Sequence, residues 1–295
     1  MRIALLADRL RVEERQLSEA FAARGHEPKL ISPASLSAGF ASDGSAKLHV
    51  ASEATDLFTP ELALDRGTAT TERAALGALL VTTGATLVNR PATTRLLADR
   101  LAAARHLSFA GIPLAETVVS FGEVATFDAI ESLGYPVMLK SITSDRGYPL
   151  AIIEDRDAAE AIVEHRTVLG DERGVIIQRF VAGPDHSVRL LVVGHEIAGI
   201  EQRALSGWRP GTETPYEAYR GAPEALNALG TRVIERLGSG CYSIEVLEQA
   251  DGLVVVGVEN LVDFRSLASR GVDVAGAIAD FALAQVAATD GERRV

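Results

Sequence analysis

Cysteine is almost absent from the chain: Cys241 is the only one among 295 residues. A single cysteine excludes a disulfide framework and a cluster of thiolate metal ligands. Cys241 lies in an apolar pattern typical of a strand, which favours a buried structural thiol over a nucleophile. The histidines are scattered without the spacing of metal-ligand pairs, so the sequence does not indicate a zinc site.

Long apolar runs and an excess of positive charge are also missing. No stretch approaches the roughly 18 apolar residues that indicate a membrane span, and the apolar start of the chain is too short for a signal peptide. A net charge of −11 argues against a general nucleic-acid binder, which needs a basic face. ATP is still possible as a ligand, because a few local cations outweigh the overall field. We therefore expect a cytoplasmic protein without membrane or nucleic-acid partners.

Hydrophobic residues make up 47% of the chain, which is enough for packed cores. The length suggests two or three lobes, because domains usually have roughly 100–200 residues. In residues 1–90 short apolar strands alternate with helices, a pattern that predicts a parallel sheet covered on both faces. Within this lobe, residues 34–54 are rich in Ser, Gly and Ala, so we interpret them as a loop.

The remaining pattern predicts two α+β lobes and a tail. Residues 91–177 form the central lobe, which begins with a single helix over 93–109 after the proline at position 91. Residues 178–288 form a mostly β lobe with two hairpins and a closing helix over 274–287, and residues 289–295 are expected to be disordered. Two such lobes after an α/β lobe can close on a ligand between their sheets.

Several short motifs occur in one order along the chain. They are V-N-R-P at 88–91, G-I-P at 111–113, G-Y-P-V-M-L-K at 134–140, I-Q-R-F-V at 177–181 and R-L-L-V-V-G at 189–194, followed by a final hairpin. In this order and spacing they resemble the RimK/LysX branch of the ATP-grasp ligases, and A-D-R-L-R-V-E-E-R-Q-L at 7–17 is similar to the LysX side in particular.

This resemblance implies an ATP-grasp fold, with α/β and α+β lobes and an N-terminal pre-ATP-grasp lobe. It also implies a two-step reaction: ATP phosphorylates a carboxylate, and an amine then displaces phosphate to give an amide. Members modify a small acidic carrier protein in lysine and arginine synthesis. The chemistry needs cations at the phosphates, carboxylates that hold Mg²⁺, and exclusion of water from the acyl phosphate.

The resemblance assigns ATP to the middle of the chain. Lys140 and Arg100 match positions that contact phosphates, although the family has a lysine where Arg100 stands. Adenine is expected against the strand formed by Gln178, Arg179, Phe180 and Val181, where the family commonly has a glutamate at the position of Arg179. Of the glycine-rich phosphate loop, only Gly147 remains at 141–149. Without the family context, Lys140 would be interpreted as a solvated strand end.

Arginines are assigned to the reacting groups. Arg189 and Arg203 match residues that face the phosphate and the acyl phosphate, a task that suits the guanidinium fork. Arg66 and Arg73 lie where the family binds the substrate carboxylate. Each of Arg189 and Arg203 could instead form an ordinary surface ion pair.

The expected metal site departs from the family pattern. Glu245 matches an acidic ligand on the first strand of the last hairpin, but Gly257 stands where the second strand should supply a glutamate. Glu259 lies two residues further on and therefore on the same face of that strand. Glu245 and Glu259 could hold one Mg²⁺, because this ion often takes only one or two carboxylates. They could also merely face a polar cleft.

The segment 206–219 replaces a basic loop of the family with aromatics and prolines, among them Trp208, Tyr216 and Tyr219. Such a segment contacts a partner, forms a lid, or packs on its own lobe.

Two functions stay open at this point. The chain is an ATP-dependent ligase that joins an amino acid to a carboxylate, plausibly on a carrier protein. Alternatively it is an impaired relative that binds nucleotide or a partner. Family members often assemble, so we expect a homo-oligomer or a hetero-oligomer with an active homologue.

Overall fold

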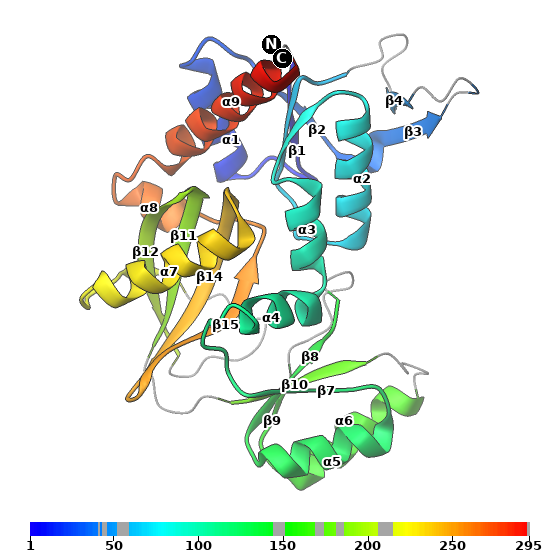
Figure 1. The fold of residues 1–295 in the computed structure, drawn as a ribbon, viewed down its shortest axis with the longest axis vertical. Helices are drawn as coiled ribbons and strands as arrows, with labels where there is room; N and C mark the ends of the chain where they lie inside the picture. The colour runs from blue at the N-terminus through cyan, green and yellow to red at the C-terminus, as the bar shows by residue number, and fades with distance from the viewer. Residues whose placement is uncertain are drawn as a thin grey trace.

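The computed structural model describes residues 1–40, 42, 46–51, 59–143, 151–168, 174–180, 186–205 and 215–293. Figure 1 shows the N-terminal lobe at the top, the C-terminal β-rich lobe below it, and the central lobe at the bottom. In the described part of the chain, no helix is long and apolar enough to cross a membrane.

The N-terminal lobe is built on a parallel sheet of order β2-β1-β5-β6, as the alternating pattern predicted. Its inner strands, β1 and β5, are apolar and buried along their whole length, which is typical of a sheet with helices on both faces. The elements are β1 (Ile3–Leu6), α1 (Val12–Ala22), β2 (Lys29–Ile31), β5 (Leu62–Asp65), α2 (Thr71–Thr82) and β6 (Thr86–Val88).

The loop predicted over 34–54 is wrong in part, because this region contains a hairpin. After a 3₁₀ turn, β3 (Leu36–Phe40) pairs antiparallel with β4 (Ala46–Val50). Leu36, Leu48 and Val50 pack against the small core under α2, which includes Leu80. The Ser, Gly and Ala content obscured these apolar positions, whose spacing of two within each strand is the relevant signal.

The single helix predicted over 93–109 is also wrong, because Asp99 divides it into α3 (Pro91–Ala98) and α4 (Arg100–Ser108). Asp99 has extended backbone angles and forms a bridge with Thr143. Its side chain accepts a hydrogen bond from the backbone N–H of Ala102 at 2.9 Å, so it acts as the N-cap of α4. The break lets the chain turn from the N-terminal lobe toward the central lobe.

The central lobe has an antiparallel sheet of order β7-β10-β8-β9, with α5 and α6 on one face (Figure 1). Ile130, Val137, Ile153 and Ile177 lie in the core between helices and sheet. The elements are β7 (Thr117–Ser120), α5 (Glu123–Leu133), β8 (Val137–Ser141), β9 (Ala151–Ile153), α6 (Arg156–Val168) and β10 (Val175–Arg179). Since β10 stays in this sheet to Arg179, a lobe boundary at 177 would cut a strand.

The C-terminal lobe has a sheet of order β13-β12-β11-β14-β15. One face packs under α7, while Leu191 and Val193 on the other join a core with Leu5, Phe21 and Ile278. The two terminal lobes therefore share a core. The elements are β11 (His186–Gly194), β12 (Glu196–Ala204), β13 (Glu217–Ala218), α7 (Glu224–Leu237), β14 (Gly240–Gln249), β15 (Gly252–Glu259), α8 (Arg265–Ser269) and α9 (Val274–Arg293).

Helix α9 is longer than the sequence predicted. It extends to Arg293, whereas we expected it to end at 287 with a disordered tail over 289–295. No proline follows, and each residue added to an existing helix gains a hydrogen bond without a new nucleation cost. Helix α9 lies beside α1 at the top of the molecule (Figure 1).

Candidate active site

Four positions form one row across the sheet of the C-terminal lobe. Arg189 on β11 is paired with Glu201 on β12 and with Glu245 on β14, and Glu245 is paired with Gly257 on β15. Residues directly opposite each other in neighbouring strands present their side chains on the same face. The register therefore brings Arg189, the expected oxyanion ligand, and Glu245, one of the two expected metal ligands, into one line.

Lys140 reaches the edge of this sheet from the central lobe. Its ammonium donates to Oε1 of Gln178 at 2.6 Å and to the backbone oxygen of Val256 at 3.1 Å. Burial lowers the pKa of Lys140 to about 8, with a further lowering by the nearby Arg100. The lysine thus joins the central lobe to β15 beside Gly257.

Arg100 begins α4 and is held at the end of β8. Its guanidinium donates to the backbone oxygens of Ser141 at 3.2 Å and Thr143 at 2.9 Å, and its backbone N–H donates to Ile142 at 2.8 Å. Its charge acts on Lys140 and on Glu259, which places the three groups in one neighbourhood. The predicted grouping of Arg100 with Lys140 is therefore present.

Glu259 and Glu245 provide carboxylates at this end of the cleft. Burial raises the pKa of Glu259, and the charge of Glu245 raises it further, while Arg100 and Lys140 oppose the shift. Oε2 of Glu245 is buried without a hydrogen-bond partner among the described residues. In the described part of the chain, no group of three or more His, Cys, Asp and Glu side chains is arranged to hold a metal. Two carboxylates, one of them with an oxygen that has no hydrogen-bond partner, fit a single Mg²⁺ whose other ligands are phosphates and water.

The position of the missing glutamate is open. A Cβ built on Gly257 would meet no atom within 4 Å. Gly257 lies opposite Glu245 on the neighbouring strand, and it is the position where the resemblance expects a glutamate. Nothing in the packing accounts for a glycine at this position.

Arg189 and Arg203 meet around Tyr216, which precedes β13. Nη2 of Arg189 donates to Oε2 of Glu201 at 2.5 Å, and the ring of Tyr216 lies 3.7 Å from Cζ of Arg189. Arg203 donates to Oγ of Ser187 at 3.1 Å, lies 3.7 Å from Glu245, and is 5.0 Å from the same ring. Both arginines therefore lie against one aromatic ring beside Glu245.

Glu201 holds this cluster from beneath, and sequence reasoning missed it. It is fully buried and also accepts a hydrogen bond from Arg270 at 2.5 Å and a short one from Ser266. A buried carboxylate shared by two arginines keeps their side chains in place. The single signal in the sequence is its spacing from Arg203 on one strand.

The strand that we expect to bind adenine already forms hydrogen bonds and an ion pair within the protein. The backbone N–H of Arg179 donates to Glu116 at 2.8 Å, and that of Phe180 donates to Pro136 at 3.1 Å. The guanidinium of Arg179 pairs with the carboxylate of Glu116 at 2.7 Å, at the surface. Gln178 is instead held inside by Lys140 and Thr117. Val181 and Gly147 lie outside the described residues, as does Trp208.

Arg66 and Arg73 lie in the N-terminal lobe, each bound to carboxylates. Arg66 is buried, and it donates to Glu14 at 3.2 Å and to the backbone oxygen of Val262 at 2.7 Å. Arg73 donates to Asp65 and to the exposed Asp8, at 2.8 Å each. Within the described part of the chain, their hydrogen bonds go to other residues than Arg189, Glu245 and Lys140.

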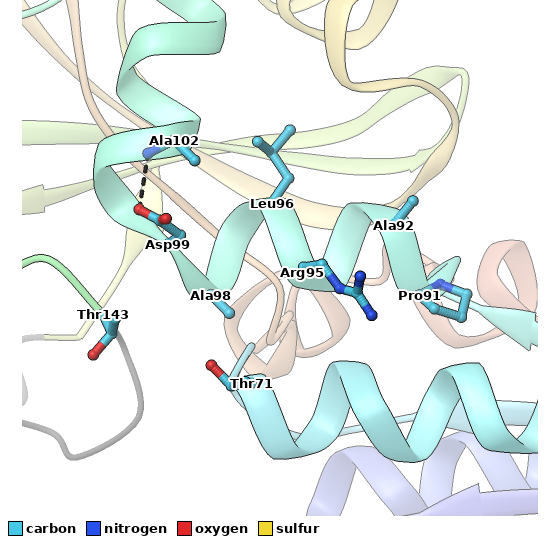
Figure 2. Close-up of a pocket in the computed structure, with 9 residues that line it drawn as sticks. All are labelled: Thr71, Pro91, Ala92, Arg95, Leu96, Ala98, Asp99, Ala102 and Thr143. Atoms are coloured by element: carbon cyan, nitrogen blue, oxygen red, sulfur yellow. Dashed lines mark hydrogen bonds between the residues drawn. The ribbon is translucent and has the colours of Figure 1, made fainter.

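A cavity of about 670 Å³ borders the site on the side of the N-terminal lobe. Figure 2 shows it between the start of α2 at Thr71 and helix α3, which contributes Arg95, with Asp99 and Thr143 at one end. Lys140 does not line it. Asp99 precedes Arg100 and Thr143 accepts a hydrogen bond from it, so the cavity lies next to Arg100.

A central antiparallel lobe and a C-terminal lobe with cations and carboxylates between their sheets define the class of ATP-grasp proteins. Comparison with protein families agrees: the RimK-like ATP-grasp domain matches residues 97–282, and the LysX preATP-grasp domain matches residues 3–96. The chain belongs to the RimK-like ATP-grasp family, and the resemblance inferred from the motifs is confirmed.

Several known proteins are similar over much of their length. The chain is 24% identical to the glutamate–LysW ligase ArgX of Sulfolobus acidocaldarius, over 67% of this chain and 73% of that one. It is also 24% identical to the probable alpha-L-glutamate ligase 1 of Shewanella amazonensis, over 95% of both. The crystal structure of a RimK domain protein ATP-grasp from Sphaerobacter thermophilus is 57% identical, with a TM-score of 0.84 over 96% of this chain and 100% of that one.

Proposed function

We propose that the protein is an ATP-dependent carboxylate–amine ligase that forms an amide through an acyl phosphate. The observation that carries the proposal is the meeting of Lys140 and Arg100 from the central lobe with the row that contains Arg189 and Glu245. Cations of this kind balance a triphosphate, and carboxylates opposite them hold its metal ion.

In the first step, a substrate carboxylate oxygen bonds to the γ-phosphorus of ATP, and the bond to the β-phosphate oxygen breaks. Lys140 and Arg100 bind the phosphates and stabilise the charge that passes to ADP. Glu245 and Glu259 would hold Mg²⁺, which when bound neutralises charge on the β- and γ-oxygens.

In the second step, the amine attacks the acyl carbon, inorganic phosphate leaves, and the amine nitrogen loses a proton. Arg189 and Arg203 contact the oxygens of the phosphate and the tetrahedral intermediate, where a fixed guanidinium fork supplies several donors. Gln178, Arg179, Phe180 and Val181 receive the adenine, and Gly147 allows the backbone to approach the phosphates.

The substrate class follows from the relatives. ArgX is named as a glutamate–LysW ligase, and another relative as an alpha-aminoadipate–LysW ligase. We therefore infer an amino acid and a carrier-protein carboxylate as substrates. Arg66 and Arg73 bind the substrate carboxylate if Arg73 exchanges its exposed partner Asp8. Cytoplasmic location and assembly, with itself or with an active homologue, belong to the same proposal.

One observation favours a second candidate, an impaired homologue that binds nucleotide or a partner without turnover. Gly257 removes a carboxylate from a position where the fold has room for one. A site with fewer carboxylates binds Mg²⁺ more weakly, and the γ-phosphate is then less well neutralised.

The decisive experiment measures ADP release with Mg²⁺ across carrier proteins and amino acids, beside nucleotide binding by calorimetry. We expect ADP formation that depends on both an acid and an amine. Nucleotide binding without ADP from any pair would support the impaired homologue. Absence of nucleotide binding would contradict the ligase and the nucleotide-binding homologue, and would leave only a partner-binding subunit.

A further inference from the structure

Tyr216 stands at the centre of the active-site row, and no step of the reaction above uses it. Its phenol donates a hydrogen bond to Oε1 of Glu245 at 2.6 Å. Its ring stacks on the guanidinium of Arg189 at 3.7 Å. One side chain therefore contacts both the expected metal ligand and the expected oxyanion ligand.

Each of these two residues has one polar atom that Tyr216 leaves without a hydrogen-bond partner. Oε2 of Glu245 and Nε of Arg189 are both buried and without a hydrogen-bond partner among the described residues. One is an acceptor suited to a cation, and the other is a donor suited to an anionic oxygen.

No other side chain described here contacts both Arg189 and Glu245 as closely as Tyr216 does. Glu201 accepts a hydrogen bond from Nη2 of Arg189 and the ring of Tyr216 lies against the guanidinium, while Nε stays buried without a hydrogen-bond partner among the described residues. Arg203 lies 3.7 Å from Oε2 of Glu245, beyond hydrogen-bond distance. Without the phenol, Glu245 would be free to turn toward Arg203 and close that gap.

The backbone beside Tyr216 is fixed on the sheet. β13 follows at once and pairs with Glu201 and Gln202 of β12. Gln202 also accepts a hydrogen bond from the backbone N–H of Arg220 at 3.0 Å. Attachment of the residues that directly follow Tyr216 to β12 gives the residue the rigidity that a positioning role requires.

We propose that Tyr216 is a positioning residue that holds Glu245 and Arg189, so that Oε2 of the carboxylate receives a divalent cation and Nε of the guanidinium receives a phosphate oxygen. The inference rests on the proposed function and assigns a residue to its metal–phosphate end. It also explains how a site that lacks a carboxylate at position 257 keeps its remaining ligand aligned.

The test uses Mn²⁺ as the probe, measured by electron paramagnetic resonance with a non-hydrolysable ATP analogue. Tyr216→Phe removes the phenol hydroxyl and keeps the ring. We expect it to weaken Mn²⁺ binding about tenfold or more, the usual cost of losing an outer partner of a metal ligand. Affinity for the analogue in EDTA should be unchanged, because the ring still covers Arg189.

Two further variants complete the design. Tyr216→Leu removes the ring as well, so it should lower the affinity for the analogue in EDTA too. Tyr219→Phe is the matched control, because it removes the hydrogen bond that the Tyr219 phenol donates to Glu248 at 2.7 Å, outside the row. It should leave both affinities unchanged. Thermal unfolding of each variant verifies the fold.

The outcomes separate the inference from the function. If Tyr216→Phe binds Mn²⁺ as tightly as the unchanged protein does, or more tightly, the positioning role is overturned. The ligase proposal still stands in that case, provided that the unchanged protein binds both Mn²⁺ and the analogue. A wild-type protein that binds neither Mn²⁺ nor the analogue overturns both.

Discussion

Lys140 keeps an ammonium where burial opposes charge. Its pKa is lowered to about 8, so the free protein loses this proton near the top of the physiological range. The depressed value means that the lysine is mostly charged at about pH 7, half charged near pH 8 and mostly neutral at about pH 9. Because phosphate binding needs the charged form, nucleotide affinity should fall as the pH rises from 7 to 9. Lys140→Arg, which stays charged, should give a flat profile by calorimetry; a falling profile in that variant would point to another group.

Removal of the charge at Lys140 separates function from stability. Lys140→Met keeps the apolar stem and removes the buried ammonium, so nucleotide binding should be lost while the Tm does not fall. Calorimetry and thermal unfolding measure the two effects. Unchanged affinity would exclude Lys140 from the nucleotide site, and a large loss of Tm would make its contacts with Gln178 and Val256 structural.

Gly257 offers the reverse experiment, a gain. Gly257→Glu places a carboxylate opposite Glu245 in space that is open around its Cβ. It should tighten Mg²⁺ binding and raise Mg²⁺-dependent ADP formation if the missing ligand limits turnover. Gly257→Gln, equal in size but uncharged, is the control and should do neither. No gain with glutamate would mean that another part of the site is limiting.

Among elements, the junction of α3 and α4 connects the fold to the site. Asp99 caps α4 through the N–H of Ala102, and Arg100 follows directly. Asp99→Ala should cost about 1 kcal/mol, a drop in Tm of about 2 °C, and should weaken nucleotide binding because Arg100 starts the frayed turn. Asp99→Asn keeps the cap and should retain both values. Equal behaviour of the two variants would contradict the capping role.

The elements also show what a sequence does and does not reveal. Strands such as β1 and β5 were predictable, because a buried parallel strand is an uninterrupted apolar run. The cap at Asp99 was not, since the helical pattern continues through it and the break depends on a distant pairing with Thr143. Lys140 and Glu245 were assigned to the site through family motifs, and their roles stay predictions. Tyr216 was assigned only to a segment, because it contacts Arg189 and Glu245 through strands that are far apart in the sequence and meet only in the fold.

At the scale of the whole molecule, the N-terminal and C-terminal lobes are joined by a buried amide as well as by a common core. Asn89 donates to the backbone oxygen of Cys241 at 2.7 Å and to Asn260 at 2.6 Å, and it accepts from the N–H of Cys241 at 2.5 Å. The motif V-N-R-P contains this residue, so its asparagine has a structural task. Cys241 itself is buried, as expected of a structural thiol.

Asn89→Ala should therefore destabilise the whole protein, because it leaves the N–H and the oxygen of Cys241 buried without partners. We expect a loss of about 3 kcal/mol in the free energy of unfolding, measured by urea denaturation. Asp280→Ala removes an exposed ion pair with Arg24 where α1 meets α9 in the same pair of lobes, and should cost under about 1 kcal/mol. If the lobes are one cooperative unit, Asn89→Ala shifts a single transition. A second transition would show that the lobes unfold independently and that their common core is not enough to couple them.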